Sequence, residues 1–377
     1  MRLRMKLAFW TCLVLLMVSP GVAPRRVDAR AEPSRVADER PPRIASGGLE
    51  VVGASEGIAR AVRDLARRAR GPFWAGYAMA GLEGDHQMCC FDSISSRGVG
   101  CCGGCRLEES DSFTMSTDRD TKVVLEGPER FFVLFRVESG SVQKIRPFSE
   151  GCELDAGRLP FYWLTGVSVD ESLQWLASFV TGEDANGKDD LTEHALAAIA
   201  AHGDRGADRV LEKFVARGQP QEVREHAAFW MGVARGRVGY DVLVSLVRDD
   251  PSTEMRKKAI FALSQSDVPE ATDALIRVAR SDREADVRGE GLFWLAQKAG
   301  QKAVGALSDA IENDPETEVK KKAVFAMTQL PDEESVPLLI RIATENKNPQ
   351  VRKEAIFWLG QSDDPRALDF IEKILNG

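Results

Sequence analysis

The side chains best suited to chemistry gather in one short stretch of the sequence, residues 86–105. A histidine is followed there by two pairs of adjacent cysteines and a fifth cysteine: His86, Cys89, Cys90, Cys101, Cys102 and Cys105. Thiolate and imidazole groups are ligands that zinc prefers. Because Cys102 and Cys105 have a C-x-x-C spacing, one hypothesis is a metal site formed by these two cysteines with His86, Cys89 or Cys90.

A second hypothesis for the same stretch is thiol-disulfide exchange at Cys102-Gly103-Gly104-Cys105. A reactive C-x-x-C motif usually lies at a helix N-terminus, which lowers the pKa of the attacking thiol. Two glycines within a cysteine-rich loop do not predict such a helix. The redox hypothesis therefore ranks below the others.

The N-terminal residues predict the cellular compartment in which these cysteines are located. Arg2, Arg4 and Lys6 precede an apolar run over residues 7–18, and Ser19-Pro20-Gly21 follows it. This order of basic, apolar and small residues is typical of a secretory signal peptide. We expect residues 1–31 to be the signal peptide, with cleavage after Ala23 or after Ala31, and the mature protein to be periplasmic or extracellular.

Export favours disulfides over the other uses of the cysteines, since disulfides persist in oxidising compartments. Cys12 lies inside the signal peptide, so six cysteines remain: Cys89, Cys90, Cys101, Cys102, Cys105 and Cys152. Adjacent cysteines rarely bond to each other, because the geometry of a disulfide requires suitably placed Cβ atoms. The sequence therefore predicts three disulfides that staple the loop, and it leaves their connectivity open.

One further motif could carry chemistry. Gly53-Ala54-Ser55-Glu56-Gly57 matches the G-x-S-x-G pattern around the nucleophilic serine of many hydrolases. That serine follows the central strands of a hydrolase sheet, and little folded chain precedes Ser55. We interpret Ser55 as a helix N-cap. Because metalloprotease, phosphate-loop and dinucleotide motifs are missing as well, we expect no catalysis and no cofactor.

Composition excludes some partners. Removal of residues 1–31 takes away six basic side chains and one acidic one, which moves the formal charge from −8 to −13. Nucleic-acid binding needs a basic surface, so we expect no nucleic-acid partner. After the signal peptide, no apolar stretch approaches the roughly 20 residues of a membrane-spanning helix. The partner that remains is another protein, of unknown identity.

The elements that must position these residues fall into two halves. Residues 32–48, with Pro33, Pro41 and Pro42, are expected to form a disordered leader. Residues 49–182 predict a small α+β domain, with a helix from Ser55 and strands at Phe73–Ala80, 122–125, 131–137 and 142–148. A helix over 172–180 closes this domain. Residues 183–190, which end a stretch from Thr181 with several glycine, aspartate and asparagine residues, form the predicted linker.

From residue 191 to the C-terminus the sequence repeats with a period of 32. One column contains Val223, Met255, Val287, Val319 and Val351, each followed by a basic residue: Arg224, Arg256, Arg288, Lys320 and Arg352. Phenylalanine recurs without exception at positions 229, 261, 293, 325 and 357. A weaker copy begins at Leu191. Each unit contains two apolar-periodic segments that must stack on neighbouring units to bury their apolar sides, so about six units form an αα-solenoid.

The columns also predict how the units pack. We interpret the phenylalanines as core, and likewise the tryptophans that alternate with alanine in the next column: Trp230, Ala262, Trp294, Ala326 and Trp358. An alternative for the tryptophans is a ligand platform. The basic runs at 256–258 and 320–322 are interpreted as solvated. His194, His202 and His226 are expected at surface or groove positions.

Residues 351–362 read V-R-K-E-A-I-F-W-L-G-Q-S and are followed by D-D-P-R-A-L. This pattern resembles the short HEAT-like repeats related to those of phycobilisome lyases, over about half of the chain. Some proteins with such repeats attach bilin chromophores and others are scaffolds. No motif here indicates a tetrapyrrole, and the resemblance implies an extended surface for binding another macromolecule.

The sequence thus favours an exported, non-catalytic scaffold or adaptor that binds a protein partner through its solenoid. The alternative is a metal-binding or thiol-redox protein that uses the loop from Cys89 to Cys105. The solenoid cannot separate the two hypotheses, whereas the oxidation state of the cysteines can.

Overall fold

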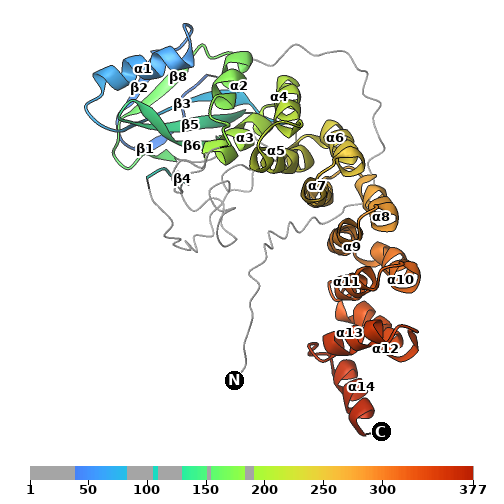
Figure 1. Ribbon diagram of the computed structural model, residues 1–377. Coiled ribbons are helices and arrows are strands. Elements are labelled where there is room, and N and C mark those ends of the chain that lie inside the picture. Colours follow the sequence, from blue (N-terminus) through green and yellow to red (C-terminus); the bar gives the residue numbers. More distant parts are fainter. Residues whose placement is uncertain (1–38, 83–104, 109–129, 151–153, 183–190, 377) are drawn as a thin grey trace, which may run out of the picture. The chain divides into compact units, whose positions relative to one another are not determined.

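The structure is a computed structural model that describes residues 39–82, 105–108, 130–150, 154–182 and 191–376 (Figure 1). The chain forms two compact units, residues 1–210 and 211–377. The first combines β-sheets with helices, and the described part of the second contains helices without strands. The predicted mainly helical fold is therefore confirmed. The expected linker, residues 183–190, lies outside the described residues.

The first unit is built on a five-stranded sheet in the order β2-β8-β3-β5-β6. These strands are β2 (Leu49–Gly53), β3 (Phe73–Ala80), β5 (Arg130–Glu138), β6 (Ser141–Ser149) and β8 (Phe161–Thr165). β2, β8 and β3 pair in parallel, whereas β3, β5 and β6 pair antiparallel. The strand predicted at Phe73–Ala80 is confirmed without shift. The one predicted at 122–125 lies outside the described residues.

The turn between β5 and β6 confirms the predicted hairpin. Ser139 and Gly140 both have positive φ, 52° and 79°. Two successive residues with positive φ are characteristic of a type I′ turn, whose twist matches that of the flanking strands. The hairpin extends the two predicted strands, 131–137 and 142–148, by one residue at each end.

The central strands β3 and β5 are buried along nearly their whole length, because both faces of the sheet are covered. On one face Trp74, Phe132 and Trp163 belong to a cluster of buried side chains. The opposite face carries Tyr77 and Phe135, both 1% exposed. Successive side chains along a strand point to opposite faces of the sheet, so each central strand contributes to the buried layer on both faces.

Helices cover the Tyr77 face of this sheet: α1 (Ile58–Arg68), α2 (Val169–Ala177) and α3 (Leu191–Ala201). The prediction that Ser55 caps the first helix is wrong, because Gly57 is the N-cap residue. The backbone N–H of Ile58 instead donates to the Glu171 carboxylate of α2. Within α2, the Ser168 hydroxyl caps the helix by accepting from the Glu171 N–H.

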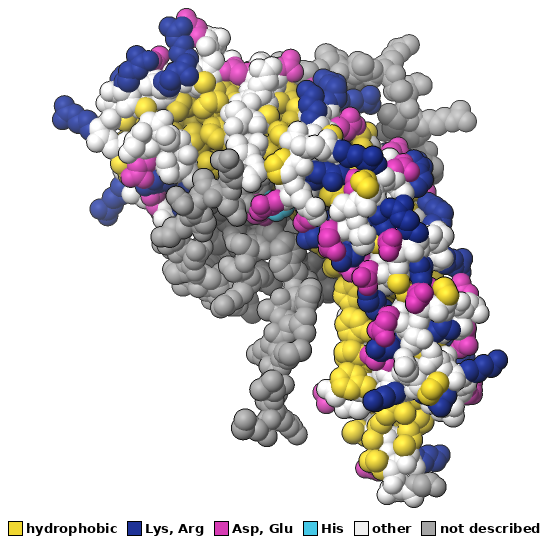
Figure 2. All heavy atoms as spheres, in the orientation of Figure 1, with side chains coloured by type: hydrophobic (Ala, Val, Ile, Leu, Met, Phe, Trp, Pro, Cys, Tyr) yellow, Lys and Arg dark blue, Asp and Glu magenta, His cyan; other side chains and the backbone are white. Residues whose placement is uncertain are grey.

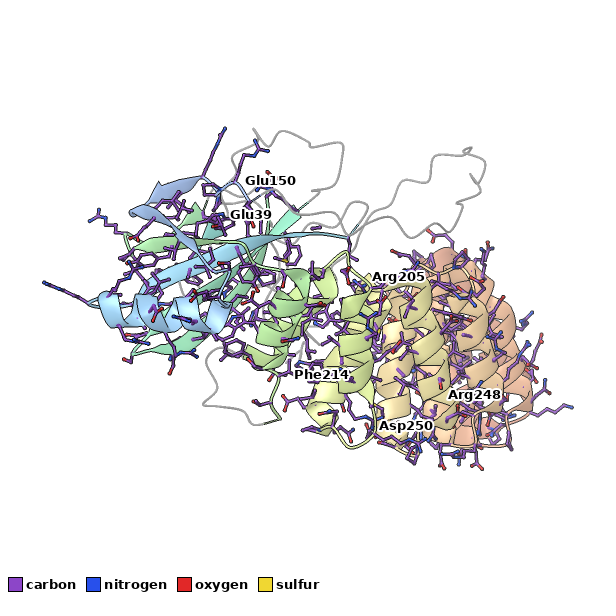
Figure 3. All side chains as sticks on the ribbon, turned by 90° about the horizontal axis from the view of Figure 1, so that it is seen from above. Glu39, Glu150, Arg205, Phe214, Arg248 and Asp250 are labelled. Carbon is purple, nitrogen blue, oxygen red and sulfur yellow. The ribbon has the colours of Figure 1, made fainter. Side chains whose placement is uncertain are left out.

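A small second sheet contacts the other face, in the order β1-β7-β4. Its strands are β1 (Ile44–Ser46), β4 (Cys105–Arg106) and β7 (Leu154–Asp155). β1 belongs to the stretch expected as a leader, residues 32–48. Glu39, labelled in Figure 3, also lies in that stretch, and its backbone oxygen accepts from the Trp163 indole N–H at 2.6 Å. Residues 39–48 are therefore attached to the folded unit.

The repeat half consists of helix pairs. After α4 (Gly206–Val215), the first helices of successive units are α5 (Gln221–Ala234), α7 (Thr253–Gln265), α9 (Ala285–Ala299), α11 (Thr317–Met327) and α13 (Pro349–Leu359). The second helices are α6 (Gly236–Asp249), α8 (Ala271–Ser281), α10 (Val304–Asn313), α12 (Asp332–Glu345) and α14 (Pro365–Asn376). First helices pack side by side in one layer, and second helices form the other layer (Figure 1).

A ladder of buried arginines connects the units. Arg256 and Arg288 each bind the carboxylate 26 residues later, Asp282 and Asp314, with N–O distances of 2.7–3.2 Å. Each arginine also donates to the backbone oxygen six residues earlier, at 3.0 Å for Arg256 and 2.8 Å for Arg288. Every such arginine thus joins two successive junctions between units.

The arginine ladder corrects the prediction for the basic run at residues 256–258. Arg256 was expected on a solvated face, but it is 1% exposed and paired with Asp282. Arg224 pairs in the same way with Asp250, which Figure 3 shows at one end of the helical layers. Buried charges need such partners, because an unpaired ion in a protein interior costs several kcal/mol.

Candidate functional site

The recurring phenylalanines do not lie in the core. Phe229, Phe261, Phe293 and Phe325 are partly exposed, and Phe357 is 55% exposed. The core is formed instead by the valine and alanine columns, for example Val223 and Ala227, at 1% and 0% exposure. Phe229 follows Ala227 by two residues, about 200° around the helix. The phenylalanines therefore occupy the side of each first helix opposite the core.

Their rings form a continuous chain of contacts across the five first helices, which we call the aromatic ladder. Its members are Trp230, Phe229, Phe261, Trp294, Phe293, Phe325, Trp358 and Phe357, in order of contact, with neighbouring centroids 4.6–5.8 Å apart. Figure 2 shows hydrophobic side chains in a column along the first-helix side of the repeat half. The ladder thus connects partly exposed rings from all five first helices.

We interpreted all three tryptophans as core residues, and this prediction is confirmed only for Trp230. Trp230 is buried, at 3% exposure, whereas Trp294 and Trp358 are only partly buried. Their indole N–H groups donate to Glu290 at 2.7 Å and to Glu354 at 2.9 Å, each one turn earlier on the same helix. The alternation with alanine places each of these indoles against the phenylalanine of the preceding unit.

Charged side chains flank the ladder at the N-terminal ends of the helices. Lys258 pairs with Glu225 of the preceding unit at 3.1 Å, and Lys322 pairs with Asp286 at 2.6 Å. The hydrogen bond from Lys322 lowers the pKa of the Asp286 carboxyl. Both lysines are at least 44% exposed, so each pair contributes at most about 1 kcal/mol to stability.

Glutamines flank the ladder on its other side, one turn after four of its five phenylalanines; Val233 is in this position after Phe229. The glutamines are Gln265, Gln297, Gln329 and Gln361. The Gln297 amide donates to the Gln329 side-chain oxygen at 2.8 Å. At the last unit, Trp358 and Gln361 line a hollow of about 330 Å³ together with Ser335 and Leu339. The ladder is thus bordered by uncharged donors and acceptors on one side and paired charges on the other.

The cysteine loop contributes little to the described structure. His86, Cys89, Cys90, Cys101, Cys102 and Cys152 lie outside the described residues. Cys105 lies in β4, where its backbone is paired with Leu154. Within the described ranges, no group of three or more histidine, cysteine or acidic residues is placed to hold a metal. Disulfides, a zinc site and thiol exchange therefore stay predictions.

A buried polar chain was not expected from the sequence. The Tyr77 hydroxyl lies 2.8 Å from the Ser172 hydroxyl, which lies 2.9 Å from His202 Nε2. His202 Nδ1 lies 2.7 Å from the Ala198 carbonyl oxygen, so this nitrogen is the donor and Nε2 the acceptor. Burial raises the pKa of Tyr77. The chain is sealed, since Tyr77, Ser172 and His202 are each at most 1% exposed.

The position of His202 corrects the expectation of a surface or groove. It lies directly after α3, and its ring packs edge-on against Phe131 with centroids 5.1 Å apart. His194 is half-buried beside Arg146 at 3.2 Å, and His226 is half-buried on α5. Ser55 lies in an exposed turn after β2, which is an edge strand of its sheet.

The repeat half consists of HEAT-like repeats. Residues 209–296 and 304–377 match the family model for HEAT repeats. No match to this chain was found among curated proteins. Among the described residues, no helix is both long and apolar enough to cross a membrane.

Solved structures with related folds belong to proteins of different kinds. Human deoxyhypusine hydroxylase in complex with glycerol is 19% identical, with TM-score 0.28, and the match covers 53% of this chain and 74% of that chain. The complex of CpcE and CpcF of phycocyanin lyase from Nostoc sp. PCC7120 is 18% identical, with TM-score 0.28 and 50% and 76% covered. The S. pombe condensin Cnd3-Cnd2 subcomplex is 20% identical, with TM-score 0.32 and 55% and 28% covered.

Proposed function

We propose that this protein is an exported, non-catalytic scaffold that binds a protein partner through its HEAT-like repeats, and that the aromatic ladder is the docking surface. The observation that carries the proposal is that a connected row of aromatic rings is partly exposed over the first helices of five successive units. Connected apolar patches of this kind on a folded surface mark interaction sites. Aromatic residues are also enriched in the buried centres of protein interfaces.

The chemistry around the ladder supports a polypeptide over other ligands. Phe293 and Phe325 are stacked, with an interplanar angle of 5°, so part of each ring face is covered by its neighbour. Sugars, nucleobases and cations bind to free ring faces. Partly exposed rings together with the glutamine amides suit the mixture of apolar groups and hydrogen-bonding groups on a protein surface.

The test is site-specific photo-crosslinking on the full chain in its native compartment. A crosslinker at position 357 should capture one defined protein species, and Phe325→Ser should reduce that capture at least about tenfold, as for an interface hot spot. A crosslinker at Val238, an exposed apolar residue on the second-helix layer, is the matched control. Equal capture at both positions would contradict docking at the ladder.

Export and the cysteine bridges are part of the proposal. The basic-apolar-small order of residues 1–31 and the even number of later cysteines support them. Intact mass of the secreted protein should reveal cleavage after Ala23 or Ala31 and the loss of six hydrogens that reduction restores. Free thiols together with bound zinc would favour the metal-site hypothesis instead.

A further inference from the structure

The charges beside the aromatic ladder alternate over four of its five helices, α5, α7, α9 and α11. Each first helix places three side chains next to its phenylalanine, seven, four and three residues before it, on the same helical face. In α5 these are Glu222, Glu225 and His226, and in α9 they are Asp286, Gly289 and Glu290. In α7 they are Glu254, Lys257 and Lys258, and in α11 they are Glu318, Lys321 and Lys322. The sets on α5 and α9 are acidic, and the sets on α7 and α11 have an excess of lysine. The corresponding residues of α13 are Gln350, Lys353 and Glu354, which have no net charge, so α13 lies outside the alternation.

Neighbouring units already use this alternation within the chain. Lys258 of α7 pairs with Glu225 of α5, and Lys322 of α11 pairs with Asp286 of α9. These contacts show that lysine-rich and acidic first helices are complementary when they lie side by side. Asp286 and Lys258 stay partly exposed, so both can also meet charges that approach from outside.

The four first helices α5, α7, α9 and α11 thus form a row in which the sign of the net charge alternates. Two copies of such a row are complementary when they face each other in opposite directions and are offset by one unit. With a twofold axis between α7 and α9, α7 of one copy faces α9 of the other, and α5 faces α11. Acidic helices then meet lysine-rich helices at every position of the four. A twofold interface is isologous, so every favourable contact is made twice. Because the two copies have identical unit spacing, the charges stay in register over these four helices.

We propose that the aromatic ladder is covered by the ladder of a second copy of this chain, in an antiparallel homodimer. This inference rests on the proposed function, since it names the polypeptide that docks at the ladder. Burial of the partly exposed rings supplies the apolar centre of the interface, and the alternating charges supply its rim and its register.

Charge exchange on the full chain tests the proposal. Lys257→Glu with Lys258→Glu makes α7 acidic, so two such copies repel each other at α9. Asp286→Lys with Glu290→Lys makes α9 basic, so these copies repel each other at α7. Each double variant alone should dissociate at least about tenfold more readily than the parent in light scattering after size exclusion. An equimolar mixture should recover a complex of twice the chain mass.

Recovery in the mixture is a signature that a merely destabilised fold cannot produce. Lys302→Glu with Arg341→Glu reverses two exposed charges on the other side of the units and should leave the dimer unchanged. A parent that is monomeric at every concentration, or a mixture that stays monomeric, would overturn the homodimer. If the parent is monomeric but Phe325→Ser still abolishes capture of another protein, docking at the ladder stands and only the second copy is refuted.

Discussion

Arg288 connects two successive turns between units of the solenoid, because it binds both Asp282 and Asp314. The guanidinium donates twice to the Asp314 carboxylate, at 2.7 and 3.0 Å, and once to the Asp282 carbonyl. Burial opposes ionisation of Asp314, but the bonds from Arg288 and from the Glu316 N–H outweigh it and lower the pKa of the carboxyl. Arg288 and Asp314 are both at most 9% exposed as side chains. Loss of one partner therefore leaves the other charge buried.

Asp314→Asn should lower the free energy of unfolding by roughly 1–3 kcal/mol at neutral pH, because a hydrogen bond to a charged group is lost. A carboxyl with a depressed folded pKa stabilises the protein above its unfolded value, about 3.9, and this contribution disappears as the pH falls through the folded value. The difference between parent and variant should therefore shrink as the pH falls below the unfolded value. Urea unfolding followed by circular dichroism, at neutral and at acidic pH, measures it.

The exposed pair Arg280 and Asp309 is the matched control. Asp309→Asn should change the free energy of unfolding by less than about 1 kcal/mol, since both side chains are solvated. A loss for Asp314→Asn that is equal at both pH values would show that charge is not the source of the effect.

At the scale of the helices, the distance between neighbouring units depends on how closely their first helices approach each other. A Cβ atom at Gly232 of α5 would overlap the backbone oxygen of Ala262 on α7. Glycine at this position thus lets the two first helices approach closely, as in other tight helix contacts. Gly305 of α10 has the opposite surroundings, with open space around its Cβ position.

These two glycines make a paired prediction. Gly232→Ala should lower the stability of the repeat half by about 1–3 kcal/mol, because neighbouring backbone must move. Gly305→Ala should be neutral or stabilise by up to about 1 kcal/mol, since alanine favours a helix more than glycine does. Thermal unfolding of both variants compares them directly. Destabilisation by Gly305→Ala, or none by Gly232→Ala, would contradict the packing of α5 on α7.

At the scale of the whole molecule, the two compact units have separate interiors. The first has its sheet, with aromatic clusters on both faces and the Tyr77-Ser172-His202 chain. The second is held by the valine and alanine columns and by the arginine ladder. Units with their own cores can open independently, as subglobal unfolding reactions do.

Ser172→Ala tests this independence. It should destabilise the first unit by about 1–3 kcal/mol, because the Tyr77 hydroxyl and His202 Nε2 lose a buried partner. Native-state hydrogen exchange should then rise in β3 and α2 and stay unchanged in α9, α11 and α13. Faster exchange throughout the chain would show that the units unfold as one.

Local periodicity predicted a large part of this fold. The 32-residue recurrence identified the helix pairs, and the apolar runs located β3 and the β5-β6 hairpin within one residue. β2, β8 and the strands of the second sheet were missed. The strands of the second sheet contain only two or three residues each, which carry too weak a pattern. The pairing of Arg256 with Asp282 was missed as well, since 26 residues separate the partners.

The sequence by itself determined the repeat, its period and the identity of each column, because these depend on spacing along one chain. Only the tertiary structure decided which columns are covered. Phenylalanine in five successive units indicates that these units use it in the same way, but burial depends on where the neighbouring helices pack. Those neighbours cover the valine and alanine columns and leave the aromatic ladder partly exposed, so the strongest pattern in the sequence marks a surface and not the core.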